Sequence, residues 1–194
     1  PENPLMTEKE FKANFPLENY SDENNVSNWK KLTKIVSKTI DTNTEKFIDV
    51  SKQKDLKQGN YFIKLTATDK YGKTVEEENY FRIIDANSKK PDTNTFFEVT
   101  DIKTSCEPSE KASFLLSTNA ENVKVFYEIE KPNGGSVSEW LTLNKEQKII
   151  EIPVLETDRG NFTIHFAFVK HNNSSSFTKT VLVPYSNKEL DIEF

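Results

Sequence analysis

The sequence predicts an all-β chain of two antiparallel β-sandwich modules in tandem, the first incomplete and preceded by a short helix. The main reason is the alternation of apolar and polar residues, clearest where Phe162, Ile164, Phe166 and Phe168 share one side of an extended run. A second reason is spacing, because turn-forming residues recur roughly every ten positions, as they do between the strands of a sandwich. A third is length, since 194 residues suit about two sandwich modules of roughly 100 residues each.

The N-terminal residues, up to position 28, carry little strand pattern. Thr7 followed by Glu10 is the pattern of a capping box, which would open a helix of one or two turns. This helix should end at Phe15-Pro16, because the residue before a proline is restricted to extended conformations. Residues 19–28 are rich in Asn, Ser, Asp and Glu, which is typical of a surface loop.

The first module is predicted to contain four strands, at residues 29–36, 45–50, 60–68 and 73–84. In the third strand, Tyr61, Ile63, Leu65 and Ala67 should share the buried face. A hairpin turn follows, in which Gly72 is free to adopt a positive φ. Four strands are fewer than the seven or so of a complete sandwich. This module is therefore either truncated at its amino end or completed by a segment outside the sequence.

A polar, aperiodic segment that contains a proline separates this module from the next. We place the first module at residues 1–86, a linker at 87–94 and the second module at 95–194. The second module carries a full set of seven predicted strands, at residues 96–102, 111–117, 123–130, 137–143, 147–154, 161–170 and 177–184. We expect it to be a complete sandwich.

Charge and hydropathy exclude two classes of partner. The net charge is −5, with lysines and acidic residues interspersed, which leaves no basic stripe for nucleic acid. No apolar run approaches the 18 or so residues of a membrane-spanning helix, so we expect no membrane insertion by this chain. The sequence starts at Pro1 without a basic and apolar leader, so either a signal was removed or the chain is a piece of a longer protein, and we favour the second interpretation.

Few residues carry the chemistry of a catalytic or metal site. His165 and His171 are the only histidines and Cys106 is the only cysteine, and they show no metal-ligand spacing. His165 falls on the polar side of its strand without a nucleophile partner, so we interpret it as a surface or partly buried histidine. Cys106 lies next to Glu107, which should raise the pKa of its thiol and leave it unreactive. We expect no enzyme activity, no metal and no cofactor.

Two further features suggest binding but have a simpler interpretation. Glu76 and Glu78 share one side of a strand, and such a row of carboxylates usually marks a solvated edge. Trp29 and Trp140 could each stack on a sugar, but a single tryptophan in a module is more often a packing anchor. We interpret the glutamates as surface charges and both tryptophans as anchors.

Short segments spread along the chain carry a family resemblance. In the second module they are residues 108–112, 123–130, 139–141, 149–153, 159–165, 168–172 and 183–185. In the first module they are Glu10-Phe11, Phe15-Pro16, Tyr20, Trp29 and residues 59–72. Through these segments the chain resembles the macroglobulin domains of the bacterial α-2-macroglobulin family, particularly those of long envelope proteins of Bacteroidetes-type bacteria. The resemblance implies tandem immunoglobulin-like sandwiches of the macroglobulin type.

In that family, tandem macroglobulin domains form the frame of a protease trap, and a thioester in a separate domain couples to the captured proteinase. The thioester motif is Cys-(Gly or Leu)-Glu-Gln, whereas Cys106-Glu107-Pro108 lacks the glutamine. The resemblance therefore implies a non-catalytic scaffold piece of an endopeptidase inhibitor. The implied partners are neighbouring macroglobulin domains of the same chain and, through the parent protein, proteinases. The implied location is the bacterial cell envelope, in the periplasm or at the cell surface.

An alternative function is a cell-surface adhesin or a carbohydrate-binding accessory module. The two hypotheses differ in where Trp140, Tyr127 and Phe126 point. Burial of all three side chains favours a scaffold, whereas an exposed aromatic row favours ligand binding. A hydrolase is not favoured, because the sequence offers no nucleophile with a partner base.

Overall fold

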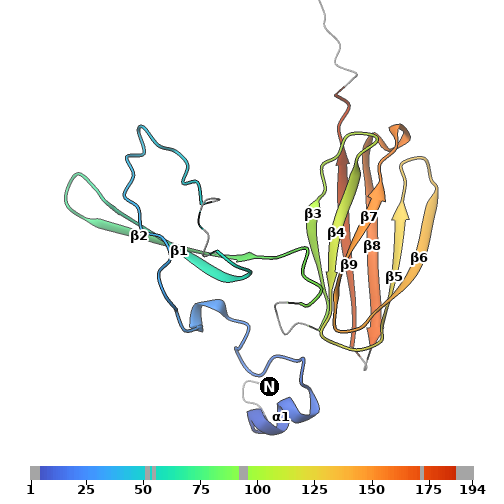
Figure 1. The fold of residues 1–194 in the computed structure, drawn as a ribbon, viewed down its shortest axis with the longest axis horizontal. Helices are drawn as coiled ribbons and strands as arrows, with labels where there is room; N and C mark the ends of the chain where they lie inside the picture. The colour runs from blue at the N-terminus through green and yellow to red at the C-terminus, as the bar shows by residue number, and fades with distance from the viewer. Residues whose placement is uncertain (1–4, 51–52, 54–55, 92–95, 171–172, 187–194) are drawn as a thin grey trace, which may run out of the picture. The chain divides into compact units, whose positions relative to one another are not determined.

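A computed structural model describes residues 5–50, 53, 56–91, 96–170 and 173–186 of the chain. The chain divides into two compact units, Pro1–Asp85 and Ala86–Phe194. The first unit begins with the helix α1 (Glu8–Asn14) and a single 3₁₀ turn, η1 (Val26–Asn28) (Figure 1).

The predicted capping box is present at the start of α1. The Glu10 carboxylate accepts a hydrogen bond from the Thr7 backbone N–H at 3.0 Å, and the Thr7 hydroxyl accepts one from the Glu10 backbone N–H at 3.4 Å. The two groups satisfy N–H donors that have no partner within the helix. The helix ends at Asn14, directly before Phe15-Pro16, so both predicted boundaries are confirmed.

The first unit contains one β-hairpin, formed by β1 (Gly59–Thr68) and β2 (Thr74–Ile83) (Figure 1). The two strands pair in unbroken antiparallel register from Gly59 opposite Ile83 to Thr68 opposite Thr74. Gly72 adopts a φ of +82° in the connecting turn, where the Asp69 carboxylate accepts hydrogen bonds from the N–H groups of Tyr71 and Lys73. The two strands and the turn between them are confirmed.

The other two strands predicted for this unit are wrong. Residues 29–36 and 45–50 are irregular, and their apolar side chains Leu32 and Phe47 are exposed. The predicted buried face of β1 is also wrong, since Ile63 and Leu65 are 45% and 48% exposed. The reason is the same in both cases: a strand needs a partner strand and a facing layer, and in its described residues this unit has only the hairpin.

The second unit is a two-layer antiparallel sandwich. Its seven strands are β3 (Glu98–Lys103), β4 (Lys111–Ser117), β5 (Val123–Glu130), β6 (Ser136–Leu143), β7 (Gln147–Pro153), β8 (Gly160–Lys170) and β9 (Asn173–Val183). They form one sheet of order β3-β4-β7 and another of order β6-β5-β8-β9. A 3₁₀ turn, η2 (Glu156–Asp158), precedes β8. All seven predicted strands are present, and this distribution of strands over two sheets is immunoglobulin-like.

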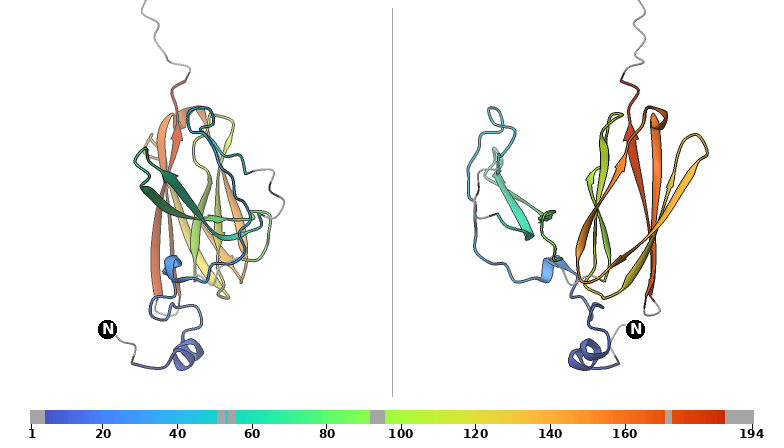
Figure 2. Two further views of the ribbon diagram at one scale, coloured as in Figure 1. Left: turned by 90° about the vertical axis from the view of Figure 1, so that its left-hand side faces the viewer. Right: turned by 45° about the vertical axis from the view of Figure 1, so that its right-hand side comes forward.

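The core lies between the two sheets, which Figure 2 shows as facing layers. The alternation in the sequence sets which side of each strand faces inward, so β5 and β8 bury every second residue. Phe114 of β4 and Phe166 of β8 meet across the layers with ring centres 5.7 Å apart. Other large, fully buried side chains are Phe162, Leu115, Leu116, Leu143, Ile164, Val123, Val125, Val154, Val181 and Val183.

Part of the segment that we expected to be linker belongs to the second unit. The Gln147 side chain donates a hydrogen bond to the Ser88 carbonyl at 2.7 Å, and the Gln147 backbone N–H donates one to the Lys89 carbonyl at 2.9 Å. Gln147 is itself a buried polar residue at the start of β7. The chain is therefore attached to the sandwich before its first strand begins.

Candidate functional site

The outer face of the four-stranded sheet presents one exposed aromatic pair. The register of β5 and β6 places Phe126 directly opposite Trp140, and their ring centres lie 5.1 Å apart with the planes tilted by 55°. Phe126 is half-buried, but Trp140 is 70% exposed. Lys124, Leu141 and Thr142 line a shallow hollow beside the indole. The interpretation of Trp140 as a packing anchor is wrong.

Tyr127 points in the opposite direction, into the sandwich. Its side chain is only 8% exposed, and its hydroxyl donates a hydrogen bond to the Glu139 carboxylate at 2.6 Å. Burial, together with the hydrogen bond to Glu139, raises the pKa of Tyr127 to about 12. Of the three aromatic residues whose burial distinguishes a scaffold from a ligand-binding module, Tyr127 is buried, Phe126 is half-buried and Trp140 is exposed. The result is neither full burial nor an aromatic row.

His165 lies on the same outer face as Trp140, as its strand position predicts. Its Nδ1 atom is 3.1 Å from the Thr178 hydroxyl, and its Nε2 atom is 3.3 Å from the Glu130 carboxylate. Both ring nitrogens thus have a polar partner on a neighbouring strand, and the side chain is half-exposed. His171 falls outside the described residues.

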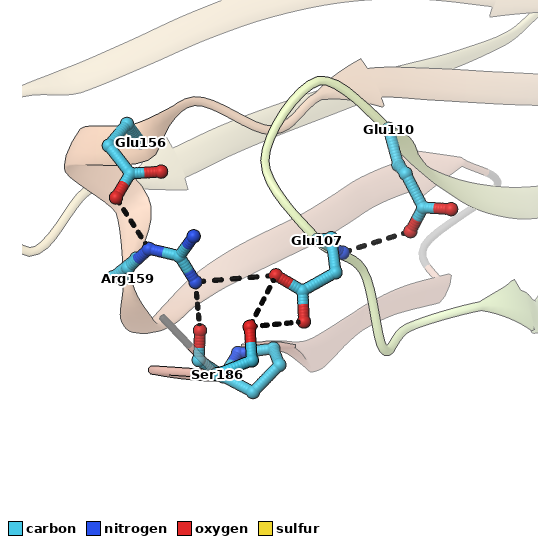
Figure 3. Close-up of polar contacts among 6 residues, drawn as sticks. Glu107, Glu110, Glu156, Arg159 and Ser186 are labelled. Atoms are coloured by element: carbon cyan, nitrogen blue, oxygen red, sulfur yellow. Dashed lines mark hydrogen bonds and ion pairs between the residues drawn. The ribbon is translucent and has the colours of Figure 1, made fainter. Parts of the chain in front are cut away.

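A polar cluster around Arg159 joins three segments at one end of the sandwich (Figure 3). Arg159 follows η2, Glu107 lies between β3 and β4, and Pro184 and Ser186 follow β9. The Arg159 guanidinium donates to the Glu156 carboxylate at 2.6 Å, to the Glu107 carboxylate at 3.3 Å and to the Pro184 carbonyl. The Arg159 side chain is only 9% exposed, so these acceptors replace most of its hydration.

The remaining members of the Arg159 cluster hold Glu107 in place. The Ser186 hydroxyl lies 2.9 and 3.0 Å from the two carboxylate oxygens of Glu107, and the Glu107 N–H donates to Glu110 at 2.9 Å. Tyr185 donates from its hydroxyl to the Arg159 carbonyl at 3.0 Å. Gly160 has a φ of +103°, which residues with a side chain rarely adopt, and a Cβ atom there would also lie 3.2 Å from the Tyr185 hydroxyl oxygen, so the position favours glycine. The cluster ties the exit of the chain to two loops.

Cys106 is buried beside this cluster. Burial raises the pKa of its thiol, Lys103 opposes the change, and Glu110 adds to it. The predicted direction is confirmed, but the predicted cause is wrong. Glu107 turns its carboxylate toward Arg159 and Ser186, and the nearby acidic group that acts on the thiol is Glu110.

A buried ion pair, which the sequence interpretation missed, closes the same end of the sandwich. Asp158 is buried and accepts hydrogen bonds from the Lys131 ammonium and from the Leu155 backbone N–H, the latter at 2.9 Å. The Lys131 ammonium also lies 4.1 Å from the centre of the Phe162 ring. The pair therefore fixes η2 against the turn between β5 and β6.

The residues singled out in the first unit have ordinary surface roles. Glu76 and Glu78 share one face of the hairpin, and they pair with Lys64 at 2.8 Å and with Lys31 at 3.1 Å respectively. Trp29, which we expected to be a core or rim anchor, is half-exposed, which excludes the core position, and its indole N–H donates to the Glu23 carbonyl at 2.7 Å. These contacts organise the local chain and bring together no group of reactive side chains.

In the described part of the chain, no three residues among His, Cys, Asp and Glu come close enough together to hold a metal ion. No helix in that part has the length and apolar character needed to cross a bilayer.

No family model matches the sequence, and no curated protein matches it. Several solved structures are similar in part, among them the following three. One is the PKD domain of an M14-like peptidase from a Thermoplasmatales archaeon, with 21% identity over 46% of this chain and 93% of that chain and a TM-score of 0.33. Another is a tetra-tandem repeat from the extending region of a large adhesion protein, with 16% identity over 68% of this chain and 33% of that chain and a TM-score of 0.36. A third is a CARDB domain from Pyrococcus furiosus in complex with di-metal ions, with 16% identity over 45% of this chain and 91% of that chain and a TM-score of 0.29. At these TM-scores the assignment rests on the strand order itself: the chain is all-β and contains one complete immunoglobulin-like sandwich.

Proposed function

We propose that this chain is a non-catalytic structural piece of an α-2-macroglobulin-like envelope protein, and that it forms part of the frame of a protease trap. The observation that carries the proposal is the attachment of the chain to the sandwich at both entry and exit. At the entry, Gln147 holds the carbonyls of Ser88 and Lys89. At the exit, the Arg159 cluster holds Pro184 and Ser186. A module that sets the orientation of its neighbours needs both connections.

The use of the ionisable residues supports the same function. In the sandwich, the least exposed charged side chains, Arg159 and Asp158, are engaged by partners within the fold. Charged groups taken out of water need such partners, and here the partners come from separate loops. These residues therefore act on the shape of the module, which is the role of a frame.

The test uses the parent protein to which we assign the chain. The parent is incubated with a panel of endopeptidases, with and without methylamine pretreatment, and covalent adducts are sought on denaturing gels. Adducts that methylamine abolishes are expected, together with a lower yield in the Arg159→Ala variant than in the exposed control Lys148→Ala. A parent that forms no adduct and gives the enzymes no protection from large inhibitors would overturn the protease-trap proposal.

A second candidate function is glycan binding, and the exposure of Trp140 favours it. An indole that packs on Phe126 at the outer face of the sheet can stack on one face of a sugar ring, with Lys124 and Thr142 beside it to hydrogen-bond the hydroxyls. Titration of the chain with a panel of oligosaccharides should then give binding that Trp140→Ala abolishes and the matched Trp29→Ala variant retains. Equal binding by both variants, or none by the original chain, argues against this function.

A further inference from the structure

The sandwich has four strand edges, which differ in how they are protected. An open edge presents unpaired N–H and C=O groups and can template another strand, so proteins cover their edges or place bulges, lysine or proline on them. The edges belong to β3 and β7 in one sheet and to β6 and β9 in the other.

Three of these edges carry a feature that interrupts pairing. β3 has an irregular register between Asp101 and Lys103. β7 carries Lys148 and ends in Pro153. β9 is covered near its end by the segment 104–106, where the Leu182 N–H donates to the Thr104 carbonyl at 2.7 Å and the Leu182 carbonyl accepts from the Cys106 N–H at 3.0 Å.

As far as the structure describes the second unit, the β6 edge carries no bulge, lysine, proline or covering segment. Its one edge-protecting feature is the charged Glu139, whose side chain points inward and accepts a hydrogen bond from Tyr127. Its eight residues include no lysine and no proline, and its register with β5 is unbroken. Among the described residues, no backbone hydrogen bond reaches β6 from any element other than β5. Two of its apolar side chains, Val137 and Trp140, are exposed. Within the described residues of the second unit, the β6 edge is thus long, regular and uncovered.

The turn that precedes β6 tells which of its backbone groups face outward. The Lys131 N–H donates to the Gly135 carbonyl at 2.9 Å, so these two residues form a hydrogen-bonded pair. Such pairs alternate along an antiparallel ladder. Residues 137, 139, 141 and 143 therefore bond to β5. The N–H and C=O groups that point away from the sheet belong to Ser136, Ser138, Trp140 and Thr142.

We propose that β6 is a dimerisation edge, to which a second copy of this chain adds its own β6 in antiparallel orientation across a twofold axis. The favoured register places Trp140 opposite the partner's Trp140. In this register Ser138 faces the partner's Thr142, Val137 faces the partner's Leu143, and Glu139 faces the partner's Leu141. The two sheets then continue as one across the twofold axis.

This register allows the backbone groups of the two β6 strands to hydrogen-bond to each other, and it opposes no side chains that repel each other. The residues with outward N–H and C=O groups, such as Ser138 and Thr142, oppose each other, as hydrogen-bonded pairs must. No like charges are opposed, whereas a shift by one pair would place the two Glu139 residues opposite each other. The two indoles, now mostly in water, pack on each other. A second copy therefore fits the edge without any change in the fold.

The interface is a single strand pair, smaller than the standard interface of about 1,200 to 2,000 Å², so the dimer should be weak. Sedimentation equilibrium of the whole chain is the test, between about 10 μM and 1 mM, the range in which weak interfaces of this kind assemble. The expected mass rises from 22.4 kDa toward twice that value as the concentration increases.

Two variants and one control separate the β6 edge from other routes to association. Ser138→Pro removes an outward N–H and spares the ladder to β5, and Trp140→Lys opposes two like charges across the twofold axis; each should keep the chain monomeric. Leu65→Lys, on the exposed face of β1, should leave the dimer unchanged. Circular dichroism checks that each variant is folded. A chain that stays at 22.4 kDa at all concentrations, or a dimer that survives both β6 variants, would overturn the proposal.

Discussion

The hairpins β1–β2 and β8–β9 start from the same kind of sequence but end in different environments. Both pair strands of ten or eleven residues in unbroken antiparallel register, and in β1 and β8 apolar residues alternate with polar ones. A second sheet covers the apolar side of β8, where Phe166 is fully buried, whereas Leu65 of β1 is half-exposed. The alternation of apolar and polar residues therefore decides which side chains share a face of the strand. Whether that face is buried depends on a second sheet, whose strands lie elsewhere in the sequence.

The largest expected difference between the two units is in their resistance to proteolysis. Segments without ordered partners open at almost no cost in free energy, whereas core strands open only with global unfolding, so cleavage rates should differ by at least about a thousandfold. Trypsin should cut first at Lys30, Lys31, Lys34 or Lys38, which are exposed and lie outside helices and strands. A stable fragment that begins between residues 85 and 95 should accumulate. A first cut within residues 120–170 would contradict the division into two units.

The next largest difference is expected in the free energy of unfolding, when an apolar residue that the alternation places on the inward face is replaced by alanine in each hairpin. Phe166→Ala removes a fully buried ring that packs on Phe114 and should lower the free energy of unfolding by about 3 to 5 kcal/mol. Leu65→Ala, at the matching position of the exposed hairpin, should change it by less than about 0.5 kcal/mol. Urea unfolding followed by circular dichroism measures both values. A large loss for Leu65→Ala would mean that its face is covered in solution.

Ion pairs in the two units should also differ in how much they stabilise the fold, but by less than the apolar residues do. Asp158→Ala leaves Lys131 and the Leu155 N–H without their shared partner in a buried site and should cost about 3 kcal/mol. Glu78→Gln breaks the solvated pair with Lys31 and should cost far less, because water and salt screen an exposed pair. Equal costs in the same urea experiment would show that the two pairs do not differ in effective burial.

The smallest effect is a loss of stability in alkali that depends on Tyr127. Because the pKa of Tyr127 is raised to about 12 in the folded chain, the unfolded chain loses this proton first. The stabilisation is complete below about pH 10 and disappears as the pH rises through about 12, with a total on the order of 2 kcal/mol. Urea unfolding at a series of pH values measures it. In the Tyr127→Phe variant, stability should fall less steeply between about pH 10 and pH 12. If stability falls as steeply as in the original chain, other groups cause the loss.

The sequence was most informative where local pattern and tertiary structure agree. The seven strands of the sandwich and the capping box of α1 follow from alternation and from the spacing of Thr7 and Glu10, which are local properties. The predicted strands at 29–36 and 45–50 failed because no partner strand lies beside them in the described chain. Alternation without a partner has no means of forming a sheet.

The polar clusters could not be predicted from the sequence, because their members lie far apart along the chain. Arg159 contacts Glu107 and Pro184 across separations of 52 and 25 residues, which no local spacing encodes. One signal was available: Arg159 is one of only two arginines in a lysine-rich chain, and arginine is favoured where a planar cation meets several acceptors. Trp140 was misassigned because alternation gives the face on which a residue lies but not that this face is the outer one.

The bridge between Ser105 and Leu182 determines how the sandwich responds to tension. The bridge is parallel, so pulling on the two ends of the chain drags its two segments in opposite directions along their common axis. The bonds from Leu182 to Thr104 and from Cys106 to Leu182 are then sheared together instead of opening one after the other. Because both must stretch at once, the first step of mechanical unfolding requires more force than unzipping a hairpin from its open end.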